Sequence, residues 1–305
     1  MKQFDLAATA RRLEFPPLVA ALERQFVAGC EVPARHVHAV GDALTALVMP
    51  AWQPGRYFGL KVVNVAPGNA ARGLPGLFAT YQLFDATTGA SLAAIDGGEL
   101  TARRTAAASA LAASRLARAD ARRQLIVGAG RVGALLAPAM RAVRAIDDVA
   151  VWSRDPAAAV RLATSLAAAG HPARAVADLA SAVAEADIVS CATLATEPLV
   201  RGAWLAPGSH LDLIGGFTPA MREADDACFA GAHVWIDTAE ALAKAGDLLH
   251  PIASGALTRD DVRGTLADLC AAPVPARDPA TRTVFKSVGT ALEDLAAAIL
   301  VYESA

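Results

Sequence analysis

A glycine-rich turn after a short apolar run constrains the fold of this chain more than any other feature. The stretch QLIVGAG, residues 124–130, is typical of a buried strand that runs into a turn, and Gly128, Gly130 and Gly133 have the spacing G-x-G-x-x-G. Such glycines allow, in order, a tight turn, the approach of a pyrophosphate to the backbone, and close packing of helix on strand. The motif predicts dinucleotide binding, with the phosphates at the start of the next helix.

Strand-like and helical segments alternate after this motif. Strands are expected over residues 124–130, 148–155, 173–176, 187–193, 209–216 and 233–238, and helices over 131–146, 156–170 and 178–186. Strands joined through helices form a parallel sheet with right-handed crossovers. We therefore expect a Rossmann domain over residues 121–279.

Residues 1–120 have a different pattern. After an opening helical stretch, strand-like runs at 36–40, 43–52, 57–65, 77–85 and 91–96 are separated by turn clusters, and 77–97 is typical of a hairpin. An alanine-rich helix is expected over 99–118. A proline-broken linker at 272–283 precedes a last helix, 287–303, which could return to this first domain. The fold class expected is α/β, with a Rossmann domain inserted in an α+β domain made of residues 1–120 and 280–305.

Composition excludes several classes of function. The chain has 305 residues, a net charge of -2 and 5% aromatic residues, without a block of like charges, so we expect neither a nucleic-acid nor a membrane-surface partner. No uninterrupted apolar segment reaches ~18 residues, and the first residues lack the apolar core of a signal peptide. The four dispersed cysteines are typical of a reducing cytoplasm, where we expect the protein. His36 and His38 have no spaced third ligand, so no metal site is predicted.

The end of the second strand of the Rossmann pattern distinguishes between cofactors. NAD-binding proteins usually place an acid there, whereas an arginine accommodates a 2′-phosphate. Ser153 and Arg154 both donate hydrogen bonds, although Asp155 lies only one residue further on. The sequence favours NADPH and leaves NADH open. Further cofactor contacts are expected from Arg131 and Val132 in the glycine turn and from Thr193 after a later strand.

Isolated basic residues in the first domain suit a small carboxylate. Lys61 lies on a largely apolar strand, where a lysine needs a partner or a ligand. Arg35, Arg103 and Arg104 supply further candidates, because arginine grips carboxylates through two parallel hydrogen bonds. From spacing alone, each of the four is more often a surface or ion-pair residue than a ligand.

The turn Gly215–Pro219, in LDLIGGFTPAMREAD, raises a separate question. It follows an apolar strand and contains Phe217, but it offers no acid or base and only the hydroxyl of Thr218. It is either a binding surface or a catalytic turn without the usual catalytic residue.

Several segments in order resemble the ornithine cyclodeaminase/mu-crystallin family. They are PARHV, GLKVVNVAPGN, DGGELTARRTAAASALAA, VGAGRVG, DIVSCAT, IGGFTPAMREADD and FKSVGTALEDLAAA, and they span nearly the whole chain. The resemblance implies a homodimer whose substrate-binding and dimerisation domain is built from the N-terminal half and the last helix. It implies that Arg35, Lys61 and Arg104 hold the substrate carboxylate, that Arg103 is a surface residue, and that Thr80 matches a polar pocket position.

The resemblance also separates activities. Cyclodeaminases and the related alanine dehydrogenases of the family carry an aspartate where this chain has Phe217. The sequence therefore looks most like the ketimine reductases, which reduce Δ1-pyrroline-2-carboxylate to L-proline or Δ1-piperideine-2-carboxylate to L-pipecolate with NAD(P)H. Phe217 would form an apolar wall near the nicotinamide, and Lys61 would also donate a proton. The alternatives are an ornithine cyclodeaminase that uses Glu223 or Asp225, and a mu-crystallin-like protein that binds NADPH without turnover.

Overall fold

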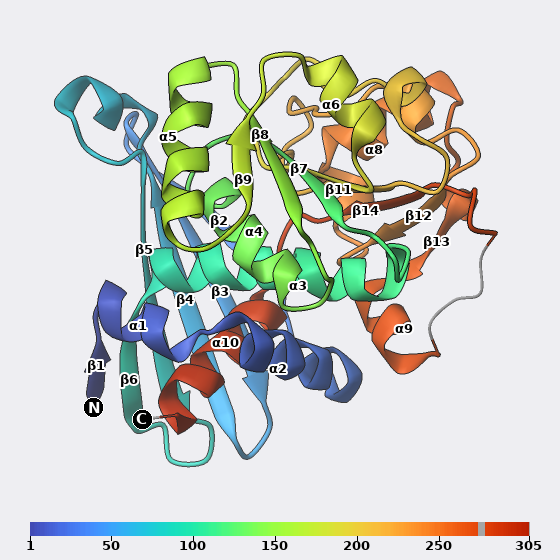
Figure 1. Ribbon diagram of the computed structural model, residues 1–305. Coiled ribbons are helices and arrows are strands. Elements are labelled where there is room, and N and C mark those ends of the chain that lie inside the picture. The colour runs from blue at the N-terminus through green and yellow to red at the C-terminus, as the bar shows by residue number, and fades with distance from the viewer. Residues whose placement is uncertain (274–277, 305) are drawn as a thin grey trace. The chain divides into compact units, whose positions relative to one another are not determined.

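The computed structural model describes residues 1–273 and 278–304, and it divides into two compact units (Figure 1). One unit comprises Met1–Arg104 with Thr290–Ala305, and the other comprises Thr105–Gly289. The long helix α3 (Gly97–Leu116) begins in the first unit and continues in the second. The sequence pattern placed these boundaries at 120/121 and 279/280, and the division of function between the units stays a prediction.

The first unit is built on a six-stranded sheet. Its order is β1 (Lys2–Phe4), β6 (Ser91–Asp96), β5 (Leu77–Asp85), β4 (Tyr57–Val65), β3 (Leu44–Gln53) and β2 (His36–Val40). Strands β2 to β6 are antiparallel neighbours, which confirms the five strands and the hairpin predicted from the sequence. Strand β1, which pairs in parallel with β6, was not predicted, because its three residues lie at the start of the stretch that the sequence pattern assigned to a helix.

Three helices cover one face of this sheet: α1 (Leu6–Arg12), α2 (Phe15–Ala28) and α10 (Ala291–Glu303) (Figure 1). Asp5 caps α1 by accepting a hydrogen bond from Ala8 N at 2.7 Å. Helix α10 contacts α2 and strands β3 to β6, so the end of the chain does return to the first unit. Nine of the thirteen residues of α10 are buried, because α2 and the sheet enclose it from two sides.

The opposite face of the same sheet carries apolar side chains that are only partly covered. Trp52, Phe58 and Phe84 form a row of half-buried rings, with centroids 6.4 Å and 5.3 Å apart. Phe78 on this face is 49% exposed and Val40 is 53% exposed. An apolar sheet face of this kind is normally covered by another layer.

The second unit contains an eight-stranded sheet, and all its strands are parallel, as predicted. Its order is β13 (Val262–Thr265), β12 (His233–Ile236), β14 (Thr283–Lys286), β11 (His210–Leu213), β10 (Ile188–Cys191), β7 (Arg123–Val127), β8 (Asp148–Trp152) and β9 (Ala173–Ala175). Strands β13 and β14 were not predicted. Because β14 pairs with both β11 and β12, this sheet extends beyond residue 279, where the sequence pattern ended the domain. The predicted linker at 272–283 partly lies outside the described residues.

The helices of this unit are α4 (Gly133–Arg141), α5 (Pro156–Ala168), α6 (Leu179–Glu185), α7 (Ala241–Lys244), α8 (Gly246–Ser254) and α9 (Leu266–Ala271). Helix α4 ends five residues before the predicted end at residue 146. The following segment is held by the Arg144 guanidinium, which donates to the carbonyls of Ala113, Ser114 and Ala117 at the end of α3. These bonds satisfy helix-terminal carbonyls and turn the chain away from the α4 axis.

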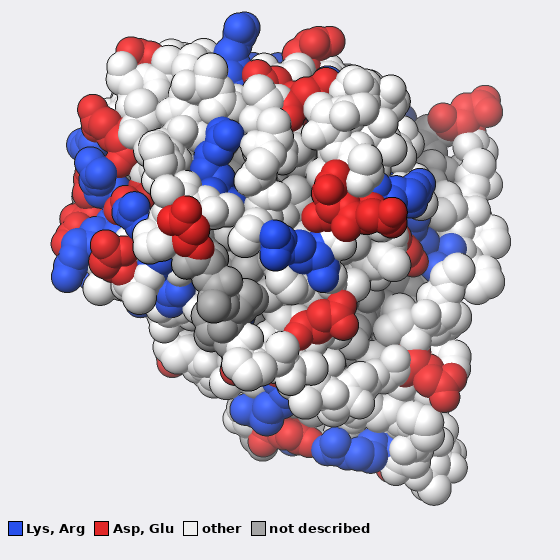
Figure 2. Space-filling model, turned by 90° about the vertical axis from the view of Figure 1, so that its right-hand side faces the viewer, with Lys and Arg blue, Asp and Glu red and all other residues white. Residues whose placement is uncertain are grey.

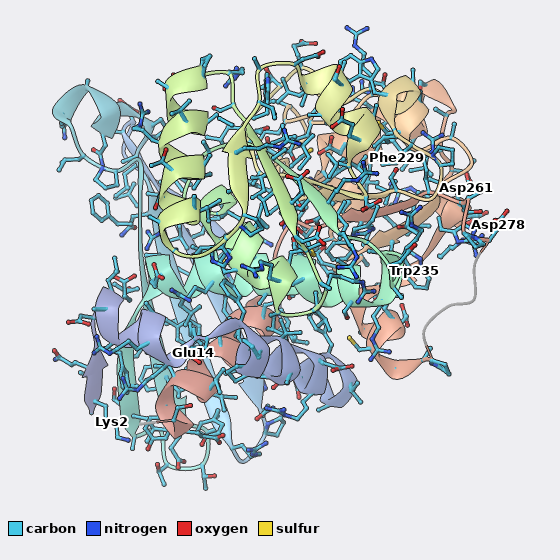
Figure 3. The ribbon with its side chains drawn as sticks, viewed as in Figure 1. Lys2, Glu14, Phe229, Trp235, Asp261 and Asp278 are labelled. Carbon is cyan, nitrogen blue, oxygen red and sulfur yellow. The ribbon has the colours of Figure 1, made fainter. Side chains whose placement is uncertain are left out.

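Alternate residues of the central strands face two different environments. Leu125, Val189 and Leu211 join an apolar core with α6 and α8 that includes Phe229, labelled in Figure 3. The residues between them form a buried polar layer: Gln124 donates to Ser190 at 3.3 Å, and Ser109 of α3 donates to Asp212 at 3.1 Å. Burial raises the pKa of Asp212 to about 7, against the lowering effect of its serine hydrogen bonds.

Asp212→Asn should change how stability depends on pH. The native state holds the Asp212 proton more tightly than the unfolded state does, so this residue makes the free energy of unfolding fall as pH rises from about 4 to about 7. The asparagine lacks this decline, and we expect its stability relative to wild type to be about 1–4 kcal/mol more favourable at pH 8 than at pH 5. Urea unfolding at both pH values measures this, with the exposed Asp260→Asn as the control. An equal difference at the two pH values would contradict it.

Candidate active site

The strands of the second unit end together at one edge of the sheet. Val127 pairs with Trp152 of β8 and with Cys191 of β10, and Cys191 pairs with Leu213 of β11. The loops after these four strands therefore start at the same level. Open parallel sheets bind their ligands at this carboxyl edge.

The glycine turn after β7 has the geometry that a dinucleotide requires. Gly128 has a φ of 113°, which favours glycine, and an added Cβ would lie 2.5 Å from Ala192 O. At Gly133 an added Cβ would overlap Gly128 O, so the turn and helix α4 pack without room for a side chain. At Gly130 nothing lies within 4 Å of such a Cβ. The turn is thus closed on the protein side and open at the position where a pyrophosphate would approach, and it fits the cofactor.

The helix that follows leaves its first amides without a side-chain cap. Val132 occupies the N-cap position of α4 and makes no capping hydrogen bond, and Arg131 beside it is exposed. The first N–H groups of a helix lack partners within the helix and point at a ligand bound there. The role of both residues in cofactor binding stays a prediction.

The turn after β8 exposes the positively charged side chain of Arg154. Arg154 is exposed and Ser153 is half-buried. Asp155, the acid that argued against NADPH, is the N-cap of α5: it accepts from Ala157 N at 3.0 Å and pairs with Arg161 at 3.3 Å. Each of its oxygens thus already has one partner, whereas Arg154 beside it is exposed.

In the first unit, two of the predicted substrate residues form one buried cluster with two acids of α10. Asp294 contacts Lys61 Nζ at 2.6 Å and accepts from Arg104 Nε at 2.9 Å. Glu293 accepts from Arg104 Nη1 at 2.6 Å. All four side chains are at least nine-tenths buried. Strand β4 brings in Lys61, helix α3 brings in Arg104, and the last helix supplies the charges that compensate them.

The protonation states of this cluster follow from burial and pairing. Burial lowers the pKa of Lys61 to about 8, and the Asp294 carboxylate only partly opposes this. Burial also acts against the charge of Arg104, but Asp294 and Glu293 outweigh it and raise its pKa. For Asp294, the attraction of Arg104 and Lys61 exceeds the cost of burial and lowers its pKa. At neutral pH the cluster holds charged groups, and Lys61 is the one closest to losing its proton.

The structure does not bring Thr80 to Lys61. Lys61 lies opposite Tyr81 across the β4–β5 pair, whereas Thr80 lies opposite Val62. Neighbouring residues of a strand point to opposite faces, so the exposed side chain of Thr80 projects from the other side of the sheet. The role of Thr80 in substrate binding stays a prediction. Tyr81, which sequence reasoning missed, is the buried polar neighbour of Lys61.

The remaining arginines of the first unit differ in role. Arg103 pairs with Glu99 at 2.7 Å and donates to Leu13 O at 3.1 Å, so it ties α3 to the end of α1 rather than standing free on the surface. Arg35 precedes the edge strand β2 and is half-buried, with β3 between it and the strand of Lys61. Its approach to the substrate stays a prediction.

The turn after β11 rests on buried acids. Phe217 is 47% exposed at the turn. Glu223 is fully buried and accepts three hydrogen bonds, two of them from Thr193, so the Thr193 hydroxyl is directed to this acid. Asp225 accepts from Gly202 N at 2.8 Å. The two acids considered as bases for deamination therefore serve as backbone acceptors.

Asp294 and Glu293 were missing from the sequence prediction of the site, and Glu223 entered it only as an alternative base for deamination. Two adjacent acids inside the otherwise apolar run ALEDLAAAILV are a local sign of buried partners, because lone charges are rarely buried. Glu223 had no such local sign, because it binds Thr193 and Gly215, which are not its neighbours in the sequence.

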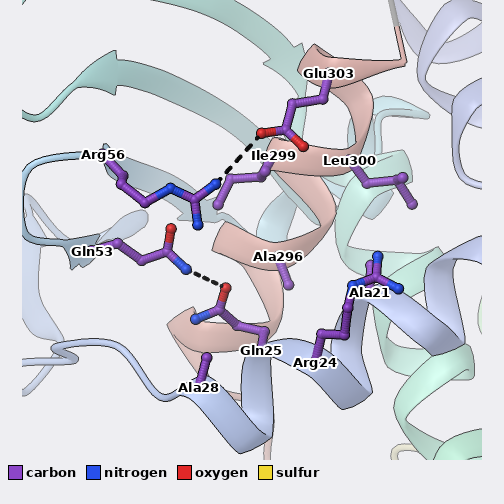
Figure 4. Close-up of a pocket in the computed structure, with 10 residues that line it drawn as sticks. All are labelled: Ala21, Arg24, Gln25, Ala28, Gln53, Arg56, Ala296, Ile299, Leu300 and Glu303. Carbon is purple, nitrogen blue, oxygen red and sulfur yellow. Dashed lines mark hydrogen bonds and ion pairs between the residues drawn. The ribbon is translucent and has the colours of Figure 1, made fainter.

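A separate surface pocket of about 210 Å³ lies between α2 and α10 (Figure 4). Its polar groups largely pair with one another: Gln53 donates to Gln25 at 2.8 Å, and Arg56 lies 3.8 Å from Glu303. None of the predicted site residues lines it, and we assign it no ligand.

The described part of the chain offers no metal cluster or membrane-spanning helix as another kind of functional site, and the face in Figure 2 offers no large charged patch. On the face shown in Figure 2, positive and negative side chains are interspersed without a large patch of either sign. Within residues 1–273 and 278–304, no three potential metal-binding side chains come together. In the same part of the chain, no helix combines the length and apolar character needed to cross a bilayer.

Comparisons with known proteins agree with this geometry. A Δ1-pyrroline-2-carboxylate reductase of Paracoccus denitrificans is 45% identical over 82% of this chain and 80% of its own length. The ketimine reductase mu-crystallin of Rattus norvegicus is 35% identical over 96% and 92%. The solved Δ1-pyrroline-2-carboxylate reductase of Thermococcus litoralis, in complex with NADH and L-proline, superposes with a TM-score of 0.93 at 30% identity, over 99% of this chain and 97% of that one.

The family model described as "Ornithine cyclodeaminase/mu-crystallin family" matches residues 13–305. This match covers both structural units, including the glycine turn of β7 and the buried cluster of Lys61 and Arg104. The chain belongs to the ornithine cyclodeaminase/mu-crystallin family.

Proposed function

We propose that this protein is an NAD(P)H-dependent reductase of cyclic ketimine carboxylates, which converts Δ1-pyrroline-2-carboxylate to L-proline or Δ1-piperideine-2-carboxylate to L-pipecolate. Relatives with these or similar activities support the reaction class. The observation that carries the choice within the family is the turn after β11. It presents Phe217, and the nearby acids Glu223 and Asp225 are engaged with backbone amides.

The chemistry agrees with such a turn. A cyclic imine already contains its C=N bond, so no water has to be activated and no amine deprotonated. The reduction needs a hydride at C2, a proton at nitrogen and a fixed carboxylate; bound NAD(P)H supplies the hydride. Ornithine cyclodeamination would need an available base, which this turn does not offer.

Lys61 and Arg104 are the proposed carboxylate and proton groups. Within the described chain, no acceptor bonds Arg104 Nη2, and Lys61 Nζ has further N–H bonds beside its contact with Asp294. These donors can hold a carboxylate in a nearly dry environment, where charged hydrogen bonds are strong. Asp294 keeps both cations charged and oriented. Lys61 would also protonate the product nitrogen, and Arg35 would complete the carboxylate grip.

We propose NADPH as the preferred cofactor, held by Gly128, Gly130, Arg131 and Val132 at the pyrophosphate and by Ser153 and Arg154 at the 2′-phosphate. The exposed Arg154, next to an Asp155 that caps α5 and pairs with Arg161, supports this choice over NADH. Thr193 and Phe217 would border the nicotinamide.

A spectrophotometric screen tests the function. Oxidation of NADPH and NADH is followed with pyrroline-2-carboxylate, with piperideine-2-carboxylate and with pyruvate plus ammonia, and ornithine plus NAD serves as the reverse control. We expect turnover with the two cyclic imines. Ammonia release from ornithine would replace the proposal by cyclodeamination, and tight NADPH binding without any turnover would replace it by a mu-crystallin-like binding role.

Lys61 should determine the alkaline limb of the pH profile. Its pKa of about 8 means that the proton donor is lost as pH rises, so kcat/KM for the imine should fall above about pH 8. Lys61→Arg stays charged, so it should lack this limb and have a roughly 100-fold lower kcat/KM at pH 7. Profiles measured from pH 6 to pH 10 check this. The same limb in both proteins would remove Lys61 as the proton donor.

Arg154→Ala should discriminate between the two cofactors. Losing a charged partner of the 2′-phosphate should weaken NADPH binding about 10- to 100-fold and change NADH binding less than about twofold. Fluorescence titration with each cofactor measures this, and Arg174→Ala on the neighbouring strand β9 is the control. Equal losses for NADPH and NADH would contradict the assignment.

We also propose a homodimer formed through the partly covered face of the first sheet. Sedimentation velocity should give twice the chain mass of 31.3 kDa. Phe78→Asp places a charge on this face and should yield monomers, whereas Val160→Asp, on a comparably exposed residue of α5, should not. A Phe78→Asp protein that remains dimeric would place the interface elsewhere.

A further inference from the structure

The turn Gly215–Pro219 lies on a buried network of charges that the proposed chemistry does not use. Glu223, Asp247 and Lys286 are all fully buried, and they come from three separate parts of the second unit: the segment after β11, helix α8 and the end of β14. Buried charges persist only when they are paired and hydrogen-bonded, so their contacts indicate what they do.

Glu223 joins two loops at the carboxyl edge of the sheet. Its Oε1 accepts from Thr193 N at 2.7 Å and from Thr193 Oγ1 at 2.8 Å, and its Oε2 accepts from Gly215 N at 2.8 Å. Thr193 belongs to the loop after β10 and Gly215 to the loop after β11. Three donors on both oxygens suit an ionised carboxylate, which only accepts. One side chain therefore sets the spacing of the two loops.

The backbone of Glu223 is in turn held by Asp247. Asp247 Oδ1 accepts from Glu223 N at 2.7 Å and from Ala224 N at 3.1 Å, and its Oδ2 accepts from Lys286 Nζ at 3.0 Å. Lys286 is the last residue of β14, inside the sheet. The network thus runs from Lys286 in the sheet to Asp247, from Asp247 to Glu223, and from Glu223 to the two loops.

The glycines of the turn are explained by the same contacts. Neither Gly215 nor Gly216 has a positive φ, so backbone strain does not require them. An added Cβ at Gly216 would lie 2.5 Å from Asp247 Oδ2 and 3.2 Å from Lys286 Nζ, and one at Gly215 would lie 1.9 Å from Thr193 O and 2.5 Å from Glu223 Oε1. The turn can rest on the charged network only without side chains, and Phe217 follows directly.

We propose that Glu223 is a positioning residue of this enzyme, which fixes the loops of Thr193 and Gly215 relative to each other and thereby places Phe217 for the reaction. This inference rests on the proposed function. Of the proposed cofactor contacts, the glycine turn of β7 and Arg154 of β8 lie on loops that Glu223 does not bind, and among the loops it binds Thr193 and Phe217 border the nicotinamide. Loss of the Glu223 tether, meaning its hydrogen bonds to Thr193 and Gly215, should therefore reduce turnover more than cofactor affinity. A displacement of about 1 Å at a reacting centre costs on the order of 100-fold in rate.

Glu223→Gln tests the tether. Its amide nitrogen would face an N–H donor of Thr193 or Gly215, so one loop loses its acceptor. We expect at least a tenfold lower kcat for the imine, a Kd for NADPH within about twofold of wild type, and faster hydrogen exchange of the amides at 192–195 and 214–218. Glu185→Gln, on an exposed residue of α6, is the matched control and should match wild type in all three.

Glu223→Asp keeps the charge beside Lys286 and hence the fold, but it is one methylene too short to reach both loops. It should show the same loss of kcat and the same faster exchange, so the test does not depend on whether the glutamine variant folds. An active wild type together with wild-type kcat and exchange in Glu223→Asp would overturn the tether. A wild type inactive on every imine would instead refute the proposed function, and the exchange measurement would still decide whether Glu223 holds the loops.

Discussion

The pairing of Asp294 with Lys61 and Arg104 is the interaction on which the first unit depends. Two cations inside an apolar layer would be too costly to bury without counter-charges. Those counter-charges lie on the last helix, 190 residues from Arg104. The end of the chain must therefore return to the sheet that its beginning forms. The second unit is consequently an insertion between the two parts of the first.

The second unit uses buried acids differently, to hold loops at the ends of strands. Glu223 binds the amides of Thr193 and Gly215, and Asp237 accepts from Thr238, Val288 and Gly289 at 2.6–2.7 Å. Burial raises the pKa of Asp237 to about 6, against these amide bonds and Lys286. Both acids lie close to the edge where a dinucleotide would bind. Carboxylate oxygens hold the loops there by accepting hydrogen bonds from backbone N–H groups, which apolar side chains could not satisfy.

Much of the site could be predicted because its signals are local. The spacing of Gly128, Gly130 and Gly133 follows from steric requirements within one turn, and the structure has the required open and closed positions. Lys61 stood out because a lysine on an apolar strand needs a partner. Strand β14 escaped prediction because TVFK begins where the proline-broken segment ends, and the place of β13 and β14 in the sheet depends on neighbours distant in sequence.

The sequence by itself determined the class of cofactor turn, the alternation of strands and helices after it, and the apolar residue at the turn after β11, since each depends on residue types at fixed short spacings. Only the tertiary structure decided what the charged residues contact. It turned Thr80 away from Lys61, engaged Asp155 as a helix cap, and joined Glu223 to two loops. The physical reason is that strand register and long-range ion pairs depend on which segments meet, and a carboxylate carries the same local pattern whether it caps, pairs or catalyses.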